Sequence, residues 1–231
     1  MDFQALPGRL AMVREVVARH QAIAGWTHEV RIVAVTKTHP PAAIQAAAAA
    51  GLRDVGENRV QEALEKQAQL DDVSVDWHLI GTLQRNKARL SVGRFALIHS
   101  VDRLELAVEL ARRVAPGEVQ AVLVQVNCSG EPQKGGVEPE GLPALLDTLK
   151  PLESLDVRGL MTMSALTDDQ TEQRRAFRLL RDLRDASERA GHRLQELSMG
   201  MSGDYPVAVE EGATMIRLGT VLFGERRSGG V

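Results

Sequence analysis

The chain has 231 residues, of which 44% are apolar, 26% are charged and only 3% are aromatic, with a formal net charge of −3. This balance argues against a nucleic-acid partner, because such binders combine basic patches with aromatic stacking platforms. A single cysteine, Cys128, excludes an internal disulfide framework and fits a reducing compartment.

The sequence contains no segment typical of membrane insertion or secretion. Arg9 and Arg14 interrupt the apolar residues of the N-terminus, so no signal-peptide core is predicted. The most apolar stretch, residues 40–52, is alanine-rich and too short to span a bilayer. We therefore expect a cytoplasmic protein with no membrane partner.

The chain alternates short strand patterns with helical patterns after an amphipathic helix predicted over residues 7–24. The predicted strands are RIVAVTK, RDVGE, WHLIG, FALIHSV, VQAVLVQVN, DVRGLMTM, ELSMG and MIRLGTVLF. The predicted helices cover residues 41–50, 59–70, 86–90, 103–114, 139–149, 169–190 and 205–211. This rhythm is typical of parallel βα units, and its length favours an α/β fold, a single (β/α)8 TIM barrel with an extra N-terminal helix, as one domain over residues 1–231.

Local signals support several of these boundaries. Asp102 and either Asp168 or Asp169 are predicted to cap helix N-termini, while Gly51 and Gly191 are predicted helix stops. A doubly wound open sheet remains the structural alternative, because a sequence does not show barrel closure. Neither glycine-rich phosphate motif, G-x-G-x-x-G or G-x-x-x-x-G-K-[ST], occurs in the chain.

Polar residues follow the ends of the predicted strands, where a barrel would carry its functional site. The loop SMGMSGD, residues 198–204, follows the seventh strand, and Gly219 and Thr220 follow the eighth. Backbone N–H groups, serine hydroxyls and a helix start can hold a phosphate without a lysine. Each stretch alone is more typical of a turn, but their joint position after the last two strands favours a phosphate site.

Lys37 ends the apolar run VAVTK. A charged residue at this position has one of two roles. Its ammonium group could reach water past a buried stem, or its amine could attack a carbonyl group. Pyridoxal 5′-phosphate (PLP) requires such an amine opposite an anion site. Arg217 could face the ring nitrogen of this cofactor, although the residues alone favour an ion pair with a carboxylate such as Glu57.

Other kinds of site are disfavoured. The histidines form no H-x-x-x-H pair and no cluster with cysteine, so no metal site is predicted. No G-x-S-x-G motif occurs. The arginine-rich segment 171–193 is interpreted as a solvated helix face, with a basic docking patch that uses Arg178 and Arg181 as the minor alternative.

Seven stretches together resemble the pyridoxal-phosphate homeostasis proteins, also called the YggS or PROSC family. They are VAVTKTHP, VGENRVQEALEK, WHLIGTLQRNKAR, VNCSGEPQKGG, GLMTM, SMGMSGDYPVAVEEGATMIRLGT and LFGER. The resemblance implies a barrel similar to the N-terminal domain of alanine racemase that holds PLP as a Schiff base. Arg59 and Thr82 depart from the family pattern, in loops away from the implied cofactor groups.

The resemblance also assigns residues in this chain. Lys37 would be the Schiff-base lysine, and Asn58 would lie beside the cofactor ring. The other implied contacts are Ser202, Gly219 and Thr220 at the phosphate, Arg217 at the pyridine nitrogen, and Met161 and Met199 along the pocket wall. The resemblance implies a role in vitamin B6 homeostasis without efficient turnover. We expect a monomer, with PLP-dependent apoenzymes as the recipients of PLP.

The main functional alternative is a weakly active PLP-dependent amino-acid racemase. Racemisation needs a second acid/base group on the face opposite Lys37. In alanine racemases a tyrosine from an additional β domain supplies it, and no such domain is expected here because the chain ends soon after the eighth predicted strand. The only tyrosine, Tyr205, lies beside the phosphate loop, so His78, His99 or a water molecule would have to substitute.

Overall fold

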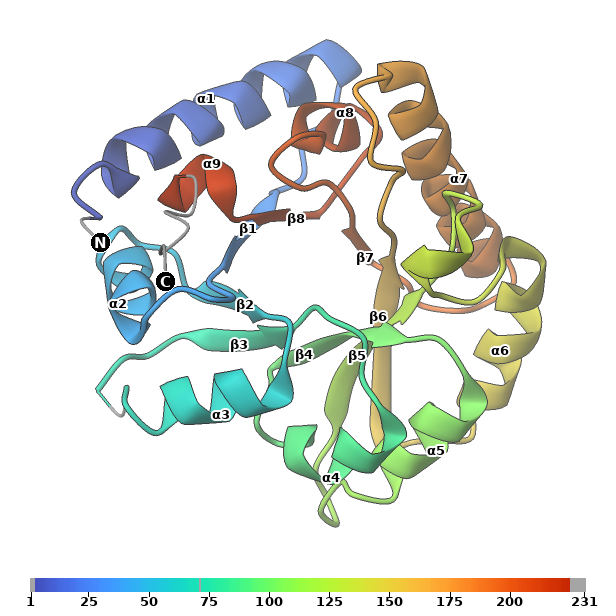
Figure 1. Cartoon of the computed structure of the whole chain (residues 1–231). Helices are drawn as coiled ribbons and strands as arrows, with labels where there is room; N and C mark the ends of the chain where they lie inside the picture. Colours follow the sequence, from blue (N-terminus) through green and yellow to red (C-terminus); the bar gives the residue numbers. More distant parts are fainter. Residues whose placement is uncertain (1–2, 71, 225–231) are drawn as a thin grey trace.

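The computed structural model describes residues 3–70 and 72–224. Within them, eight parallel strands close into a barrel in chain order (Figure 1). They are β1 (Arg31–Val35), β2 (Asp54–Glu57), β3 (Asp76–Leu79), β4 (Leu97–Val101), β5 (Gln120–Gln125), β6 (Leu155–Met161), β7 (Glu196–Ser198) and β8 (Met215–Leu218). The predicted (β/α)8 barrel is confirmed. An open sheet is excluded because the strands pair in chain order and the last strand, β8, pairs with the first, β1.

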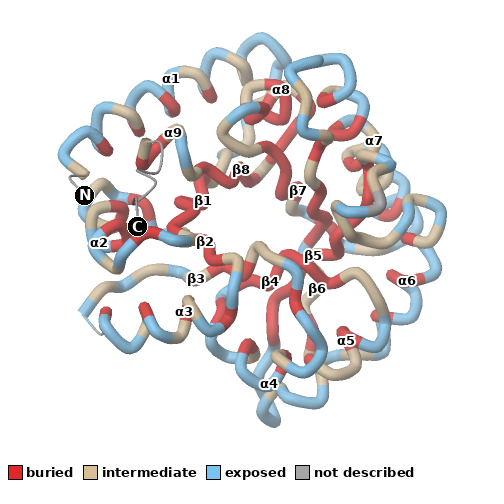
Figure 2. Tube along the Cα trace, in the orientation of Figure 1, coloured by how far each residue is buried: buried red, intermediate tan, exposed pale blue. Residues whose placement is uncertain are grey.

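Helices surround the barrel, and their outer faces are exposed to solvent (Figure 2). They are α1 (Leu6–Ala24), α2 (Pro41–Ala49), α3 (Val60–Gln67), α4 (Ala88–Ser91), α5 (Leu104–Ala111), α6 (Leu142–Leu149), α7 (Gln170–Arg189), α8 (Tyr205–Glu210) and α9 (Thr220–Phe223), with 3-10 turns at η1 (Arg85–Lys87), η2 (Pro132–Lys134) and η3 (Pro139–Gly141). The extra helix α1 packs against α8 and α9. None of the helices described is long and apolar enough to cross a membrane.

Strand side chains alternate between the barrel interior and the layer beneath the helices, as the two-residue period of a strand requires. Val33 belongs to a small interior cluster with Leu97, Leu123 and Met215. Its neighbour Ala34 belongs to the larger outer cluster that includes the helices. This alternation fixes which residues past each strand end can face the barrel axis.

Two predicted boundaries are wrong. The eighth strand ends at Leu218, and residues 220–223 form α9, because the N–H groups of Gly219 and Val221 bond to Ser202 Oγ instead of a neighbouring strand. Asp102 does not cap α5; it pairs with Arg103, which occupies the cap position.

Other boundary signals are reproduced. The Asp169 carboxylate accepts a hydrogen bond from the Thr171 N–H at the start of α7, as predicted. Gly51 and Gly191 follow their helices with φ of 83° and 90°. Glu225 and Arg226, which complete the LFGER motif, lie outside the described residues.

The single cysteine is buried just past β5. Burial raises the pKa of the Cys128 thiol to about 12. Because the thiolate is the reactive form, we expect iodoacetamide at about pH 8 to leave native Cys128 unmodified and to label it fully once the chain is unfolded. Stoichiometric labelling of the native protein, measured by intact mass, would contradict this burial.

Candidate cofactor-binding site

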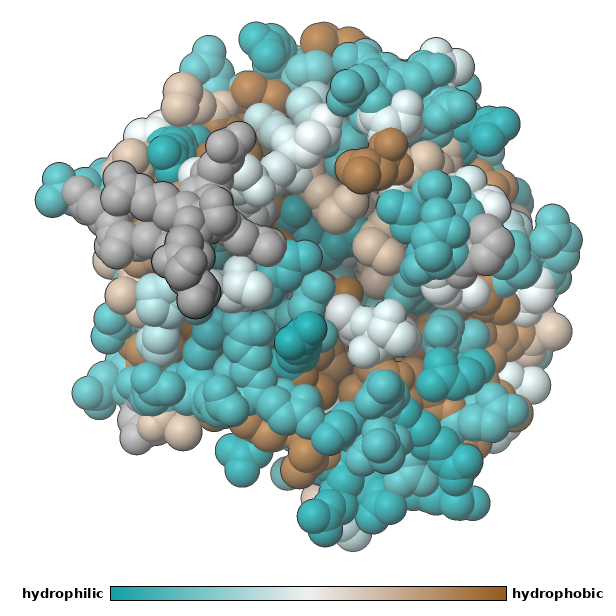
Figure 3. All heavy atoms as spheres, viewed as in Figure 1, coloured by the Kyte–Doolittle hydropathy of each residue, from teal (hydrophilic) through white to brown (hydrophobic). Residues whose placement is uncertain are grey.

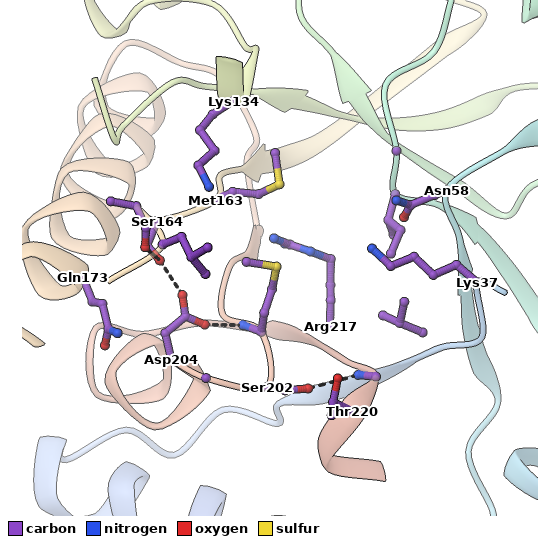
Figure 4. A pocket seen from close by; sticks show the side chains of 18 of the residues that line it. Lys37, Asn58, Lys134, Met163, Ser164, Gln173, Ser202, Asp204, Arg217 and Thr220 are labelled. Carbon is purple, nitrogen blue, oxygen red and sulfur yellow. Dashed lines mark hydrogen bonds between the residues drawn. The ribbon is translucent and has the colours of Figure 1, made fainter. Parts of the chain in front are cut away.

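A cavity of about 610 Å³ opens at the C-terminal ends of the strands. Hydrophilic residues cover much of the surrounding face, around a central recess (Figure 3). Lys37 and Asn58 lie on one side of the cavity, Ser164 and Asp204 lie on the other, and Arg217 lies between them (Figure 4). The lining includes the predicted site residues Lys37, Asn58, Ser202, Arg217, Gly219 and Thr220.

Lys37 lies two residues past β1, between two anchored peptide groups. On one side, the Thr36 carbonyl accepts a hydrogen bond from Lys66 Nζ at 2.8 Å. On the other, the Thr38 N–H donates to Glu62 Oε1 at 2.5 Å. Thr38 has a φ of 64°, a left-handed conformation that non-glycine residues seldom adopt. The two bonds hold this conformation and so direct Lys37 to the cavity.

The same cluster accounts for Glu57, which the sequence offered as a partner for Arg217. Glu57 Oε1 accepts hydrogen bonds from Lys66 Nζ at 2.7 Å and from Thr36 Oγ1 at 2.6 Å. Burial raises the pKa of Glu57 despite these two bonds. Glu57 thus points out of the barrel toward α3, and the expected pair with Arg217 is wrong.

Sequence reasoning missed Lys66, although a signal was present. Val60, Ala63 and Lys66 follow one another at three-residue intervals and form the buried residues of α3. A lysine in the apolar register of a helix requires a buried partner, since an isolated buried ammonium is strongly unfavourable. Glu57, in the preceding strand, is that partner.

Asn58 lies beside Lys37 at the end of β2 (Figure 4). Gly81, after β3, packs directly against its backbone, because a Cβ at position 81 would lie 2.3 Å from the Asn58 carbonyl oxygen. Only glycine allows this approach without displacing Asn58. The loops after β2 and β3 therefore form one wall of the cavity.

The loop after β7 and the turn after β8 meet at Ser202. Its Oγ accepts hydrogen bonds from the N–H groups of Gly219 at 3.2 Å and Val221 at 3.3 Å. Asp204 fixes the loop by accepting bonds from the Met201 N–H and from Ser164 Oγ, both at 2.5 Å. Two backbone donors and a hydroxyl thus converge where an anion can be held.

Arg217 brings a buried cation to the cavity. It is 4% exposed and donates to Ser198 Oγ at 2.7 Å and to the Thr162 carbonyl at 2.9 Å. Burial lowers the pKa of Arg217 to about 10, although Asp204 attracts the charge. The guanidinium is still protonated at neutral pH.

Two predicted pocket residues do not line the cavity. Met161 belongs to the interior cluster below it, and Met199 points outward into the layer beneath the helices. Met163 and Met201, each two residues further along, line the cavity instead. Met199 was chosen wrongly because strand side chains alternate and this one faces outward. Met161 faces the barrel interior but lies in the layer of side chains below the cavity.

The lining also contains residues that sequence reasoning did not select: Lys134, Ser164, Gln173 and Asp204. Asp204 carried a signal, because it ends the SMGMSGD loop. The others lie in connections after β5 and β6 or on α7. Whether they reach the cavity depends on how those segments fold back over the barrel mouth. Tyr205, His78 and His99 are not part of the lining.

The arginine-rich helix α7 is tied to the chain's own carboxylates. Arg174 pairs with Glu210 and Glu211, and Arg178 and Arg181 both pair with Glu211, at 3.0 and 2.9 Å. These pairs join α7 to the end of α8 and account for these three arginines. The described residues contain no group of three metal-ligating side chains.

The fold and the matched residues place the chain in a class of barrels that includes a racemase domain. The family model described as "Alanine racemase, N-terminal domain" matches residues 10–227. A Pseudomonas aeruginosa protein named pyridoxal phosphate homeostasis protein is 48% identical over 87% of this chain and 86% of its own length. A protein of the same name from Aquifex aeolicus is 46% identical over 85% and 87%.

A solved structure agrees with these relatives. PipY of Synechococcus elongatus PCC7942, with PLP bound, superposes with a TM-score of 0.83 at 42% identity, and the match covers 95% of this chain and all of that one. The chain belongs to the family of pyridoxal phosphate homeostasis proteins.

Proposed function

We propose that this chain binds PLP in the cavity at the barrel mouth, as a Schiff base with Lys37, and acts in intracellular vitamin B6 homeostasis. The observation that carries the proposal is the meeting of Lys37, Arg217 and the Ser202 loop in one cavity. The relatives named for pyridoxal phosphate homeostasis and the PLP bound to PipY support it.

The residues present fit the cofactor. Ser202, Gly219 and Thr220 would hold its phosphate, Arg217 would face its pyridine nitrogen, and Asn58 would lie beside its ring. The Lys37 amine would be the nucleophile that holds the cofactor through its aldehyde carbon, with loss of one water molecule. When bound, the cofactor supplies an electrophilic aldehyde that is stored reversibly on the protein.

We propose that residues 1–231 form a single cytoplasmic, monomeric domain, which passes PLP on to apoenzymes without efficient turnover. A weakly active racemase needs an acid/base group opposite Lys37. The groups considered for that role, Tyr205, His78 and His99, do not line the cavity. No observation of the site favours the racemase over the carrier.

The phosphate assignment predicts a selective effect of Ser202→Ala. A hydroxyl bonded to a charged group contributes about 1.5–3 kcal/mol, so we expect the variant to bind PLP about tenfold or more weakly. Pyridoxal, which lacks the phosphate, should bind both proteins alike. Equilibrium dialysis measures both ligands.

A matched control is Ser129→Ala, since Ser129 bonds to Asn127 past β5 and is not among the cavity residues. It should bind PLP like the unaltered chain. If Ser202→Ala weakened pyridoxal as much as PLP, the phosphate would lie elsewhere. If the unaltered chain bound no PLP, the proposed function itself would be wrong.

A further inference from the structure

A chain of polar side chains, of which Asp54 is half-buried and the others are buried, crosses the barrel below the cavity. Asp54 Oδ1 lies 2.9 Å from His78 Nε2, and His78 Nδ1 lies 2.9 Å from His99 Nε2. His99 Nδ1 lies 3.0 Å from Ser198 Oγ. The same oxygen accepts a hydrogen bond from Arg217 Nη1 at 2.7 Å. Only Arg217 of these five lines the cavity, so the proposed cofactor site leaves the other four unexplained.

Strand alternation brings these residues inside the barrel. The β2–β3 register pairs Gly56 with His78, and Asp54 lies two residues before Gly56 on the same side. The β3–β4 register pairs His78 with the interior residue Leu97, two residues before His99. Ser198 pairs with Met215, so it faces these histidines from the opposite wall. His78, His99 and Ser198 are each at most 1% exposed.

The two ends of the chain fix the direction of every hydrogen bond. Arginine can only donate, and a carboxylate can only accept. Arg217 therefore donates to Ser198, and the Ser198 hydroxyl donates to His99 Nδ1. His99 Nε2–H then donates to His78 Nδ1, and His78 Nε2–H donates to Asp54. In this arrangement both rings are neutral and each ring nitrogen has a partner.

The opposite direction is less favourable. A doubly protonated His78 would donate Nδ1–H to His99 Nε2, which would move the His99 proton to Nδ1 and turn it toward Ser198. The Ser198 hydroxyl, which already accepts from Arg217, would then lack its His99 acceptor. A buried donor without an acceptor costs about 1–3 kcal/mol.

The charges around the chain favour the first arrangement. Burial, together with the neighbouring groups His78, Arg217 and Arg31, holds the pKa of His99 well below its ordinary value. Burial alone would raise the pKa of Asp54, but the His78 bond and the cations Arg31 and Arg53 outweigh it and lower the pKa. Asp54 is thus the charged acceptor at one end, and Arg217 is the charged donor at the other.

We propose that Asp54, His78, His99 and Ser198 form a one-directional hydrogen-bond relay that positions the Arg217 guanidinium at the cavity, with both histidines neutral and protonated on Nε2. The four are positioning residues, since they act on a ligand only through Arg217. The role toward PLP rests on the function proposed above, whereas the direction of the relay does not.

The direction is tested in the ligand-free protein by ¹⁵N NMR of the imidazole rings, with His78→Gln and His99→Gln used to assign the signals. We expect both rings to show a protonated Nε2 and an unprotonated Nδ1 at about pH 8, where an unperturbed histidine is neutral. A proton on the Nδ1 of either ring at this pH would overturn the relay.

The positioning role is tested with Ser198→Ala and Ser198→Thr, because threonine keeps the hydroxyl. Ser198→Ala should weaken PLP binding about tenfold, shift the absorption spectrum of the bound cofactor and change the His99 Nδ1 resonance. Ser198→Thr should restore all three readouts. If the unaltered chain binds PLP and Ser198→Ala matches it in affinity and spectrum, the positioning role is wrong. If the unaltered chain binds no PLP, the proposed function fails, while the NMR result still decides the relay.

Discussion

Lys66→Met is expected to lower the free energy of unfolding by about 3–5 kcal/mol at neutral pH, because it removes one partner of a buried ion pair. Lys66 Nζ bonds to Glu57 Oε1, Glu62 Oε1 and the Thr36 carbonyl, all within 2.8 Å. Its loss leaves Glu57 buried beneath α3 with only the Thr36 hydroxyl as donor. Chemical denaturation monitored by circular dichroism measures the change.

The same variant should become pH-dependent in a defined direction. Burial already raises the pKa of Glu57, and removing Lys66 raises it further, so the native state holds a proton that the unfolded state releases. The stability is then fully present below the ordinary glutamate pKa and is lost as the pH rises through the raised pKa of native Glu57. Protonation thus relieves part of the defect in acid.

Two further variants test whether the unpaired Glu57 carboxylate causes the loss of stability in Lys66→Met. Adding Glu57→Gln to Lys66→Met removes the unpaired charge and should recover about 2 kcal/mol at neutral pH. Lys150→Met is the matched control, because Lys150 forms its ion pair with Asp147 at the surface and should be nearly neutral. Equal destabilisation at both ends of the pH range, with no recovery from Glu57→Gln, would contradict the buried pair.

Gly200→Ala is the second substitution expected to have a large effect. Gly200 has a φ of 92°, and a Cβ there would lie 2.6 Å from Ala208 Cβ and 3.1 Å from Tyr205 Cα. Left-handed strain and overpacking together should lower the free energy of unfolding by about 2–4 kcal/mol. The clash pushes α8 away from the loop that carries Ser202, so PLP binding should weaken as well.

Gly203→Ala, three residues along the same loop, provides the control. A Cβ at position 203 meets nothing within 4 Å, and its φ lies outside the left-handed range. Thermal unfolding of the ligand-free variants should place Gly203→Ala within about 0.5 kcal/mol of the unaltered chain. Similar losses for both variants would mean that the loop does not pack against α8 as described.

The strand ends carried most of what could be predicted about the site. Lys37 follows an apolar strand run, Arg217 lies near the end of another strand and Ser202 lies in a glycine-rich loop. Their residue types and positions were sufficient to place them at the barrel mouth. The wall residues depend on which side of its strand each side chain faces and on how deep in the barrel it lies, which is why Met161 and Met199 were chosen instead of Met163 and Met201. A sequence pattern does not resolve strand ends that finely.

Long-range polar contacts were not predictable in the same way. Lys66 and Glu57 meet because α3 folds back over β2, and His99 meets Ser198 across the barrel interior. Each pair joins separate elements, and His99 and Ser198 are 99 residues apart. Local periodicity shows that such groups are buried but does not identify their partners.

The central claim, covalent storage of PLP on Lys37, is tested most directly by trapping. The PLP-loaded protein is reduced with borohydride, digested and analysed by peptide mass spectrometry. The account predicts one reduced adduct per chain, on the peptide that contains Lys37 and not on the one that contains Lys134. Lys37→Ala and Lys37→Arg should give none, since neither offers a primary amine. An adduct on another lysine, or none on the unaltered chain in excess PLP, would contradict the account.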